Sequence, residues 1–261
     1  MTARGGDALR EAAETIASRG QVVALTGAGI SVDSGIPAFR GAQGMWNRYD
    51  PMEYATLGAF RRDPEKVWGM LAEMVDLLRA AVPNPAHKAL ATLERMGLLR
   101  SVITQNVDGL HQEAGSRNVI EFHGAARDLI CLSCRTRYST WEKIRERIPP
   151  RCTCGEILKP DIVFFGELIP RTALALAEAE AETAAVLLVV GTSAEVTPAC
   201  DIPRIAKRQG ALIVEINPEE TVLTRFLSDL HLREPASSAL SRLLAEVQSL
   251  LPPHPGNGGR P

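Results

Sequence analysis

Short apolar runs alternate with amphipathic stretches along most of the chain. Uninterrupted apolar runs, such as residues 22–25 and 185–190, predict strands that are buried on both faces. Stretches with apolar residues three or four positions apart, such as residues 64–81, predict helices with one face in the core. Helices are predicted over 7–18, 64–81, 86–96, 170–183, 202–209 and 237–251, and strands over 22–25, 101–104, 119–122, 185–190 and 211–216. This order predicts an α/β protein with a doubly wound, parallel, Rossmann-like sheet.

Two segments interrupt the alternation. Residues 41–83 begin irregularly and continue into a helix, which predicts a lid and helical module beside the sheet. Residues 128–158 carry four of the five cysteines and predict a small zinc-binding insertion domain. The Rossmann-like domain is then discontinuous and consists of residues 1–40, 84–127 and 159–251. The Pro- and Gly-rich tail, residues 252–261, is predicted to be disordered.

Charge and cysteine use narrow the class of protein. A net charge of −2 argues against direct nucleic-acid binding, because such proteins present strongly basic surfaces. No apolar run approaches the roughly 18 residues of a membrane span, and the N-terminus lacks the apolar core of a signal peptide. Clustered cysteines favour thiolate metal ligation in a reducing compartment. We therefore expect a cytoplasmic protein without a membrane partner.

The cysteines form two close pairs, Cys131 with Cys134 and Cys152 with Cys154, separated by residues 135–151. Two such pairs fit the tetrahedral sulfur ligation of zinc. The alternative is a set of buried or redox cysteines, which would not require both pairs. Four thiolates leave no open coordination position, so a zinc ion here would be structural. The fifth cysteine, Cys200, is predicted to be a small core residue.

A glycine turn, Gly27-Ala28-Gly29, directly follows the first predicted strand. The missing side chains let backbone N–H groups approach a phosphate, and the polar residues within 31–34 are predicted to cap a following helix. The alternative is a plain tight turn, because the glycine spacing departs from the dehydrogenase fingerprint and no acidic residue closes a second strand about 20 positions on. Phe39 and Arg40 add an aromatic wall and a cation that suit a pyrophosphate.

Polar side chains follow the next strands. Gln105, Asn106 and Asp108 come after the strand predicted over 101–104, and His123 comes after 119–122. Carboxyl ends of parallel strands meet at one edge of a sheet, where ligands bind. Amides and a carboxylate suit a ribose and a carboxamide, although they also form turns. An imidazole with a pKa near 6.5 suits a general base, with a structural histidine as the alternative.

Later segments add to the same edge. Gly191-Thr192-Ser193 and Asn217 end apolar strands and offer hydroxyls and an amide to a ribose and an adenine. Residues 159–167, K-P-D-I-V-F-F-G-E, present β-type backbone that would pair with an extended peptide. The alternative for that segment is an ordinary buried strand.

Together these motifs resemble the sirtuin family of NAD-dependent protein deacylases, of the bacterial and archaeal type. The matching motifs occur in family order: G-A-G-I-S at 27–31, S-G-I-P-A-F-R-G at 34–41, T-Q-N-V-D-G-L-H at 104–111, F-H-G at 122–124, the cysteine pairs, K-P-D-I-V-F-F-G-E at 159–167, G-T-S at 191–193 and I-N-P at 216–218.

The resemblance implies a protein-lysine deacylase that consumes NAD as a co-substrate and carries a structural zinc. The acyl-lysine oxygen would attack the nicotinamide ribose, and the products would be nicotinamide, O-acyl-ADP-ribose and free lysine. His123 would act as general base on the ribose hydroxyls, with Asn106 as the second catalytic residue. The partners would be acyl-lysine proteins. An NAD-dependent mono-ADP-ribosyltransferase and a non-catalytic zinc-knuckle interaction protein are the alternatives.

The resemblance also assigns binding residues. NAD would contact Gly27, Ala28, Gly29, Ser31, Phe39, Arg40, Trp46, Gln105, Asn106, Val107, Asp108, Gly191, Thr192, Ser193 and Asn217. The acyl-lysine peptide would contact Val163, Phe165, Gly166 and Val196, and zinc would be held by Cys131, Cys134, Cys152 and Cys154.

Acyl selectivity follows from one departure. Sirtuins that remove succinyl groups resemble one another in a Tyr and an Arg, three residues apart, on the helix after the lid. Leu71 and Met74 occupy the matching positions here. Without a cation for an acidic chain, we expect acetyl or another neutral acyl group, and Gly69 and Ala72 leave room for a longer one.

Overall fold

A computed structural model of the chain describes residues 5–40 and 44–252. The larger of two bodies is built on a six-stranded parallel sheet with the order β3-β2-β1-β7-β8-β9. Its strands are β1 (Val22–Thr26), β2 (Leu99–Thr104), β3 (Val119–Glu121), β7 (Val186–Val190), β8 (Leu212–Ile216) and β9 (Leu230–Leu232). β1 and β7 are buried along their whole length, because both sheet faces are covered by helices.

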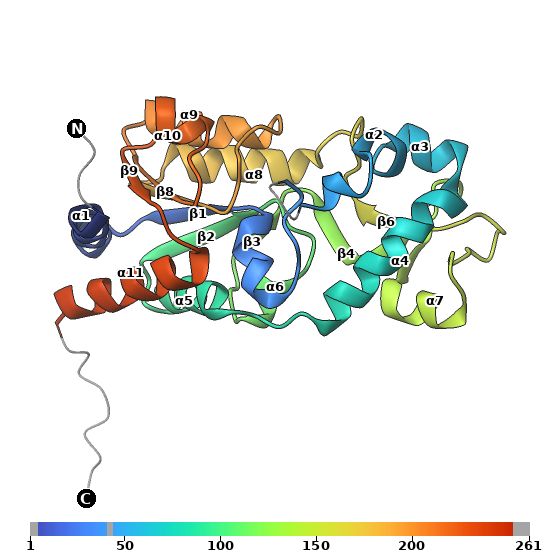
Figure 1. The fold of residues 1–261 in the computed structure, drawn as a ribbon, viewed down its shortest axis with the longest axis horizontal. Helices are drawn as coiled ribbons and strands as arrows, with labels where there is room; N and C mark the ends of the chain where they lie inside the picture. Colours follow the sequence, from blue (N-terminus) through green and yellow to red (C-terminus); the bar gives the residue numbers. More distant parts are fainter. Residues whose placement is uncertain (1–4, 41–43, 253–261) are drawn as a thin grey trace, which may run out of the picture.

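Helices cover the sheet in two layers (Figure 1). One apolar core lies between the sheet and α1 (Gly5–Arg19), α5 (Pro85–Arg95) and α11 (Ala236–Leu250). A second core lies on the other face, under α8 (Arg171–Glu182) and α9 (Ile202–Arg208). Shorter helices connect the layers: η1 (Ala28–Ser34), α6 (Leu110–Glu113), η3 (Ala199–Asp201) and α10 (Val222–Phe226). The predicted doubly wound fold is confirmed.

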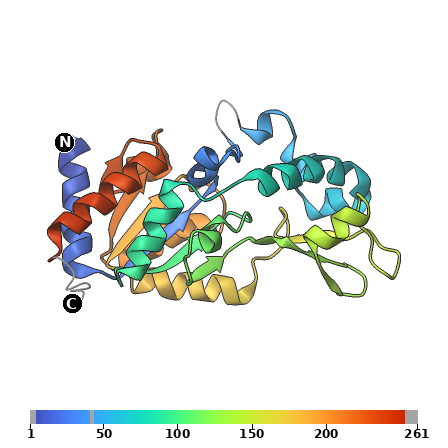
Figure 2. The ribbon, with the colours of Figure 1, turned by 90° about the horizontal axis from the view of Figure 1, so that it is seen from below.

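The smaller body lies at the end of the sheet away from α1 (Figure 2). It contains a three-stranded antiparallel sheet with the order β5-β4-β6 and a group of helices. Its elements are η2 (Met45–Asn47), α2 (Pro51–Tyr54), α3 (Leu57–Arg62), α4 (Pro64–Ala80), β4 (Gly124–Ile130), β5 (Arg137–Ser139), α7 (Thr140–Glu146) and β6 (Lys159–Ile162). Helix α4 buries Trp68, whose Nε1–H donates to the Leu158 carbonyl at 2.8 Å, so the helical part and the cysteine-bearing part share one core.

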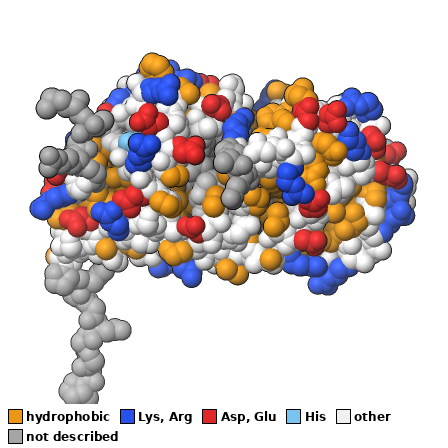
Figure 3. Space-filling view, viewed as in Figure 1, with side chains coloured by type: hydrophobic (Ala, Val, Ile, Leu, Met, Phe, Trp, Pro, Cys, Tyr) orange, Lys and Arg blue, Asp and Glu red, His pale blue; other side chains and the backbone are white. Residues whose placement is uncertain are grey.

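Every predicted helix and strand is present, to within two residues at each end. The elements that were not predicted are α2, α3, α6, α7, α10, β4, β5 and β9, together with the 3-10 helices. Residues 41–43 and, apart from Pro252, the predicted disordered tail lie outside the described residues. On the face shown in Figure 3, basic and acidic side chains are interspersed with apolar ones.

The predicted helix capping after the glycine turn was wrong. Ser31, Asp33 and Ser34 lie inside the 3-10 helix η1, whose N-cap is Gly27 with no side-chain cap bond. The cause is the contact with the residue that follows β7: Gly29 N–H donates to the Gly191 carbonyl at 2.8 Å, which starts the helix directly at the turn. A Cβ on Gly29 would lie 2.6 Å from Gly191 Cα, so this approach requires glycine.

Candidate active site

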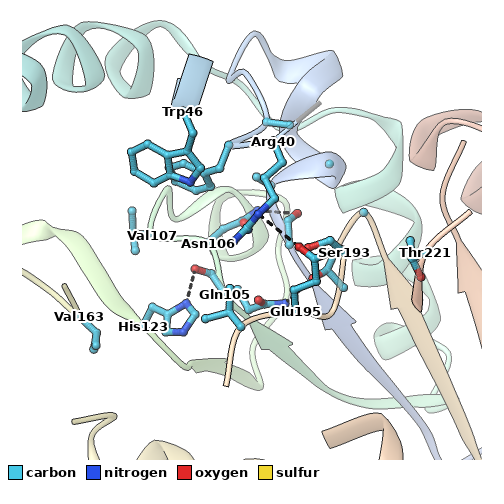
Figure 4. A pocket seen from close by; sticks show the side chains of 18 of the residues that line it. Arg40, Trp46, Gln105, Asn106, Val107, His123, Val163, Ser193, Glu195 and Thr221 are labelled. Carbon is cyan, nitrogen blue, oxygen red and sulfur yellow. Dashed lines mark hydrogen bonds and ion pairs between the residues drawn. The ribbon is translucent and has the colours of Figure 1, made fainter. Parts of the chain in front are cut away.

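A cavity of about 1160 Å³ lies where the carboxyl ends of the sheet strands meet the smaller body. Most of the site residues proposed from the sequence line it: Gly27, Ala28, Gly29, Phe39, Arg40, Trp46, Gln105, Asn106, Val107, His123, Val163, Phe165, Gly166, Gly191, Thr192, Ser193, Val196 and Asn217. Ser31 and Asp108 are not among the lining residues and lie behind the wall. Figure 4 shows His123 and Val163 toward one end of the cavity and Thr221 toward the other.

His123 is held in one tautomer by the backbone. Its Nδ1 lies 3.1 Å from the carbonyl oxygen of Gln105 (Figure 4). A carbonyl only accepts, so Nδ1 carries the proton and Nε2 keeps its lone pair. Burial lowers the pKa of His123, and the Gln105 carbonyl opposes this in part. The imidazole is therefore neutral near pH 7 and able to accept a proton.

Asn106 connects the cavity to the two residues behind it. Its side-chain N–H₂ donates to the Gly27 carbonyl and to Ser31 Oγ, both at 3.2 Å. Ser31 Oγ in turn donates to Asp108 Oδ2 at 2.8 Å. The other oxygen of Asp108 accepts the Leu110 backbone N–H at 3.0 Å. Ser31 and Asp108 thus orient the amide of Asn106 from below.

Two buried histidines, His87 and His111, support the same wall, and neither was among the predicted catalytic or binding residues. His111 Nε2 lies 2.9 Å from Thr26 Oγ1, and the His111 and His87 rings meet edge to face at 4.9 Å. Burial lowers the pKa of His111 to about 3 and that of His87 to about 4. His87 lies in the first turn of α5, where Asn84 caps the helix and also bonds the Ile30 carbonyl.

The middle and far parts of the cavity are lined by hydroxyls, amides and charges. Gln105 donates to Thr192 Oγ1 at 3.0 Å, and Asn217 donates to the Thr192 carbonyl at 3.4 Å. Arg40 Nε lies 3.4 Å from Glu195 Oε2, and this ion pair spans the cavity (Figure 4). No local pattern in the sequence indicates Glu195, because its ion pair depends on a partner far away in the chain.

Residues 163–166, which we call the peptide segment, form the wall beside His123. The Val163 N–H donates to the His123 carbonyl at 2.9 Å. The Phe165 N–H donates to the Ala55 carbonyl at 2.9 Å, so the segment bridges to the helical part of the smaller body. The ordinary strand considered as an alternative ends at Ile162, and the peptide segment lies beyond it.

The four clustered cysteines fit a zinc ion. Their sulfur atoms all lie within 4.8 Å of one another, with Sγ–Sγ distances of 3.6 Å for Cys131–Cys154 and 3.5 Å for Cys134–Cys152. Zn–S bonds of about 2.3 Å at tetrahedral angles require sulfur atoms about 3.8 Å apart. The Tyr138 hydroxyl lies 3.2 Å from Cys152 Sγ and can donate to that thiolate. Cys200 lies outside this cluster, in η3, and its side chain is buried.

The cavity also fits a dinucleotide. The glycine turn brings backbone N–H groups to its wall, Arg40 supplies a cation at the middle, and amides line both ends. Phe39 and Trp46 stack at 5.1 Å between ring centroids and close one side with apolar surface. Among the described residues, no helix is long and apolar enough to cross a membrane.

The fold and the cavity define a dinucleotide-binding α/β protein with a thiolate metal module, and the comparisons narrow this class. The Sir2 family model matches residues 27–198. The NAD-dependent protein deacylase 1 of Archaeoglobus fulgidus is 48% identical over 241 residues, covering 91% of this chain and 97% of the relative. The chain therefore belongs to the Sir2 family, and the sirtuin resemblance is confirmed.

Solved structures agree. An NAD complex of a Sir2 homologue superimposes with a TM-score of 0.84 at 46% identity, covering 92% of this chain and 93% of that one. Sir2Af2 bound to a myristoylated histone peptide gives a TM-score of 0.81 at 38% identity, covering 94% and 98%.

Proposed function

We propose that this protein is an NAD-dependent protein-lysine deacylase that releases nicotinamide, O-acyl-ADP-ribose and free lysine. The observation that carries the proposal is the position of His123. Its ring lines the cavity with one nitrogen fixed on the Gln105 carbonyl, between the amides of residues 105–106 and the peptide segment. This is the arrangement that proton removal from a ribose beside an acyl-lysine requires.

NAD supplies an ADP-ribosyl group whose nicotinamide leaves during the reaction. We assign its nicotinamide and ribose end to Gln105, Asn106 and Val107, near His123, with Phe39 and Trp46 excluding water from that end. The adenosine end is assigned to Gly191, Thr192, Ser193 and Asn217. Arg40 and the turn formed by Gly27, Ala28 and Gly29 would face the phosphates. Ser31 and Asp108 act from behind by orienting Asn106.

His123 is the proposed general base. Because Nδ1 donates to the Gln105 carbonyl, only Nε2 can accept a proton from a ribose hydroxyl. Since burial lowers its pKa, the imidazole needs no deprotonation at neutral pH. Asn106 is the second proposed catalytic residue, and its buried amide would orient the same sugar.

The acyl-lysine peptide is proposed to lie between the peptide segment and Val196. Val163, Phe165, Gly166 and Val196 line the cavity next to His123. Beyond them, the cavity reaches Met70, Leu71 and Met74 of α4. These side chains are apolar and carry no cation, so a neutral acyl chain is favoured over a succinyl group.

The remaining parts complete the proposal. Cys131, Cys134, Cys152 and Cys154 would hold a structural zinc, since four thiolates leave no position for a substrate. Thiolate ligation agrees with a reducing, cytoplasmic location. We assign residues 1–40, 84–127 and 159–251 to the NAD-binding domain, 41–83 to the lid and helical module, and 128–158 to the zinc-binding domain. The ends of the NAD-binding segments at 124–127 and 159–162 extend into the antiparallel sheet of the smaller body.

The test is to incubate the protein with NAD and an acetyl-lysine peptide and to identify the products by mass spectrometry. We expect nicotinamide, O-acetyl-ADP-ribose and deacetylated peptide in equal amounts, and no nicotinamide release without the peptide. ADP-ribose attached to protein, in place of O-acetyl-ADP-ribose, would identify a mono-ADP-ribosyltransferase and overturn the proposal.

A further inference from the structure

An ion pair between a buried lysine and a partly buried glutamate lies directly beneath the peptide segment. Lys159 Nζ is 2.8 Å from Glu167 Oε2, and the two side chains are 3% and 22% exposed. Lys159 lies at the start of β6, and Glu167 follows the segment immediately. The ammonium also lies 4.4 Å from the centre of the buried Phe164 ring. The pair therefore joins the chain before the segment to the chain after it.

The same two side chains also bind the backbone of the segment and its approach. Lys159 Nζ donates to the carbonyls of Ile162, at 2.6 Å, and Pro160, at 3.2 Å, so all three of its N–H groups are used. Glu167 Oε2 accepts the Phe164 backbone N–H at 2.8 Å. The pair thus holds the backbone directly before the peptide segment, at Phe164 within it, and at Glu167 directly after it.

Backbone hydrogen bonds also join the peptide segment to the residues around His123 and to the helical part of the smaller body. The Val163 N–H donates to the His123 carbonyl, and Phe165 exchanges backbone bonds with Ala55 and Leu57. A Cβ on Gly124, the residue after His123, would lie 2.2 Å from the Asp161 carbonyl oxygen. β6 is therefore packed against the backbone that carries His123, and movement of one displaces the other.

A buried ion pair is a poor way to gain stability, because its desolvation cancels much of the attraction. The fixed geometry of such a pair is better suited to holding the backbone that it binds in one position. We propose that Lys159 and Glu167 are positioning residues. They hold the backbone of residues 163–166 in the place where an acyl-lysine peptide can pair with it and still lie within reach of His123. This inference rests on the proposed deacylase function. Small displacements of a bound substrate lower the rate of reaction by large factors, so the position of the peptide segment directly affects turnover.

The experiment compares Lys159→Met, Glu167→Gln and the double variant in the full chain. For each we would measure the KM and kcat for an acetyl-lysine peptide, the Kd of ADP-ribose by calorimetry, and the melting temperature. We expect each variant to raise the peptide KM at least tenfold while the Kd of ADP-ribose stays within twofold. The double variant should melt closer to the wild type than Lys159→Met, because no unpaired carboxylate remains, without recovering the peptide KM.

The matched control is Arg137→Met, which breaks the ion pair of Arg137 with Asp161 on the same strand β6 but touches no residue of the segment. It should leave the peptide KM within twofold. A peptide KM that is unchanged in the double variant would overturn the inference, as would ADP-ribose binding that weakens in parallel with it. Amide hydrogen exchange supplies a second measurement if turnover is too slow to follow. The Val163 and Phe165 amides should exchange faster in Lys159→Met than in the wild type. Unchanged exchange would overturn the inference. A wild type that binds ADP-ribose but does not deacylate the peptide would instead refute the proposed function.

Discussion

Arg40 and Glu195 form an ion pair across the middle of the cavity, with Nε and Oε2 3.4 Å apart and both side chains about half exposed. Arg40 comes directly after Phe39, on the aromatic side of the cavity. Glu195 lies in the loop after β7. The Glu195 carboxylate thus pairs with the Arg40 guanidinium, which we assign to the pyrophosphate of NAD. Binding of the dinucleotide must replace one anion on Arg40 by another.

Glu195→Gln should therefore tighten NAD and ADP-ribose binding. Exposed ion pairs contribute at most about 1 kcal/mol, so we expect a decrease in Kd of up to about fivefold by calorimetry. Glu219→Gln is the control, because it removes the same charge from the cavity lining without touching Arg40. Equal tightening by both variants would show that only the overall charge matters.

His123→Ala should abolish deacylation while ADP-ribose binding and the melting temperature are retained. Loss of a general base typically costs about 10²–10⁴ in kcat. In the wild type, kcat/KM should stay level between pH 8 and about 7.5 and should reach half its maximum only below pH 6.5, because burial lowers the pKa of His123 below its usual value. It should fall only at lower pH, as the imidazole becomes protonated. A profile that already falls to half its maximum between pH 8 and 7 would contradict the neutral-base assignment.

Acyl selectivity should change when a cation is placed in the acyl end of the cavity. The Leu71→Tyr/Met74→Arg variant should raise kcat/KM for a succinyl-lysine peptide by at least about tenfold, since charge-assisted hydrogen bonds contribute about 1.5–3 kcal/mol. Kinetics with matched acetyl and succinyl peptides would measure this. In the wild type, equal kcat/KM values for the two peptides would refute the predicted preference for neutral chains.

Zinc content should depend on the cysteine cluster alone. Cys131→Ser should lose the metal and lower the melting temperature by on the order of 10 °C, because Cys131 and Cys152 belong to the same core as Trp68. Elemental analysis and calorimetry would test this. Cys200→Ser, outside the cluster, should keep one zinc per chain.

Acid should destabilise the protein through His87 and His111. Both are neutral in the fold, with pKa values of about 4 and about 3, whereas in the unfolded chain each titrates near 6.5. The unfolded state then binds more protons below pH 6.5, so stability falls as the pH drops from 6.5 to about 4 for His87 and to about 3 for His111. At pH 5 the loss is about 2 kcal/mol per histidine. Denaturant unfolding of His111→Gln should show a weaker pH dependence than the wild type over this window.

Much of the fold was readable because its signals are local. The apolar runs that became β1 and β7 and the spacing within α4 depend only on neighbouring residues. The glycine turn was found for the same reason, but its helix caps were wrong, because contact with Gly191 starts η1 at the turn itself. That contact joins residues far apart in the sequence.

The sequence by itself determined the alternating elements, the four thiolates and the polar residues that follow strand ends, since each is a property of a short stretch. Only the tertiary structure decided that Ser31 and Asp108 support Asn106 from behind, that Glu195 meets Arg40, and that Lys159 and Glu167 brace the peptide segment. These relationships arise where the two bodies and the strand ends pack together. Pairing of charges across such contacts depends on distance in space, which no local pattern encodes.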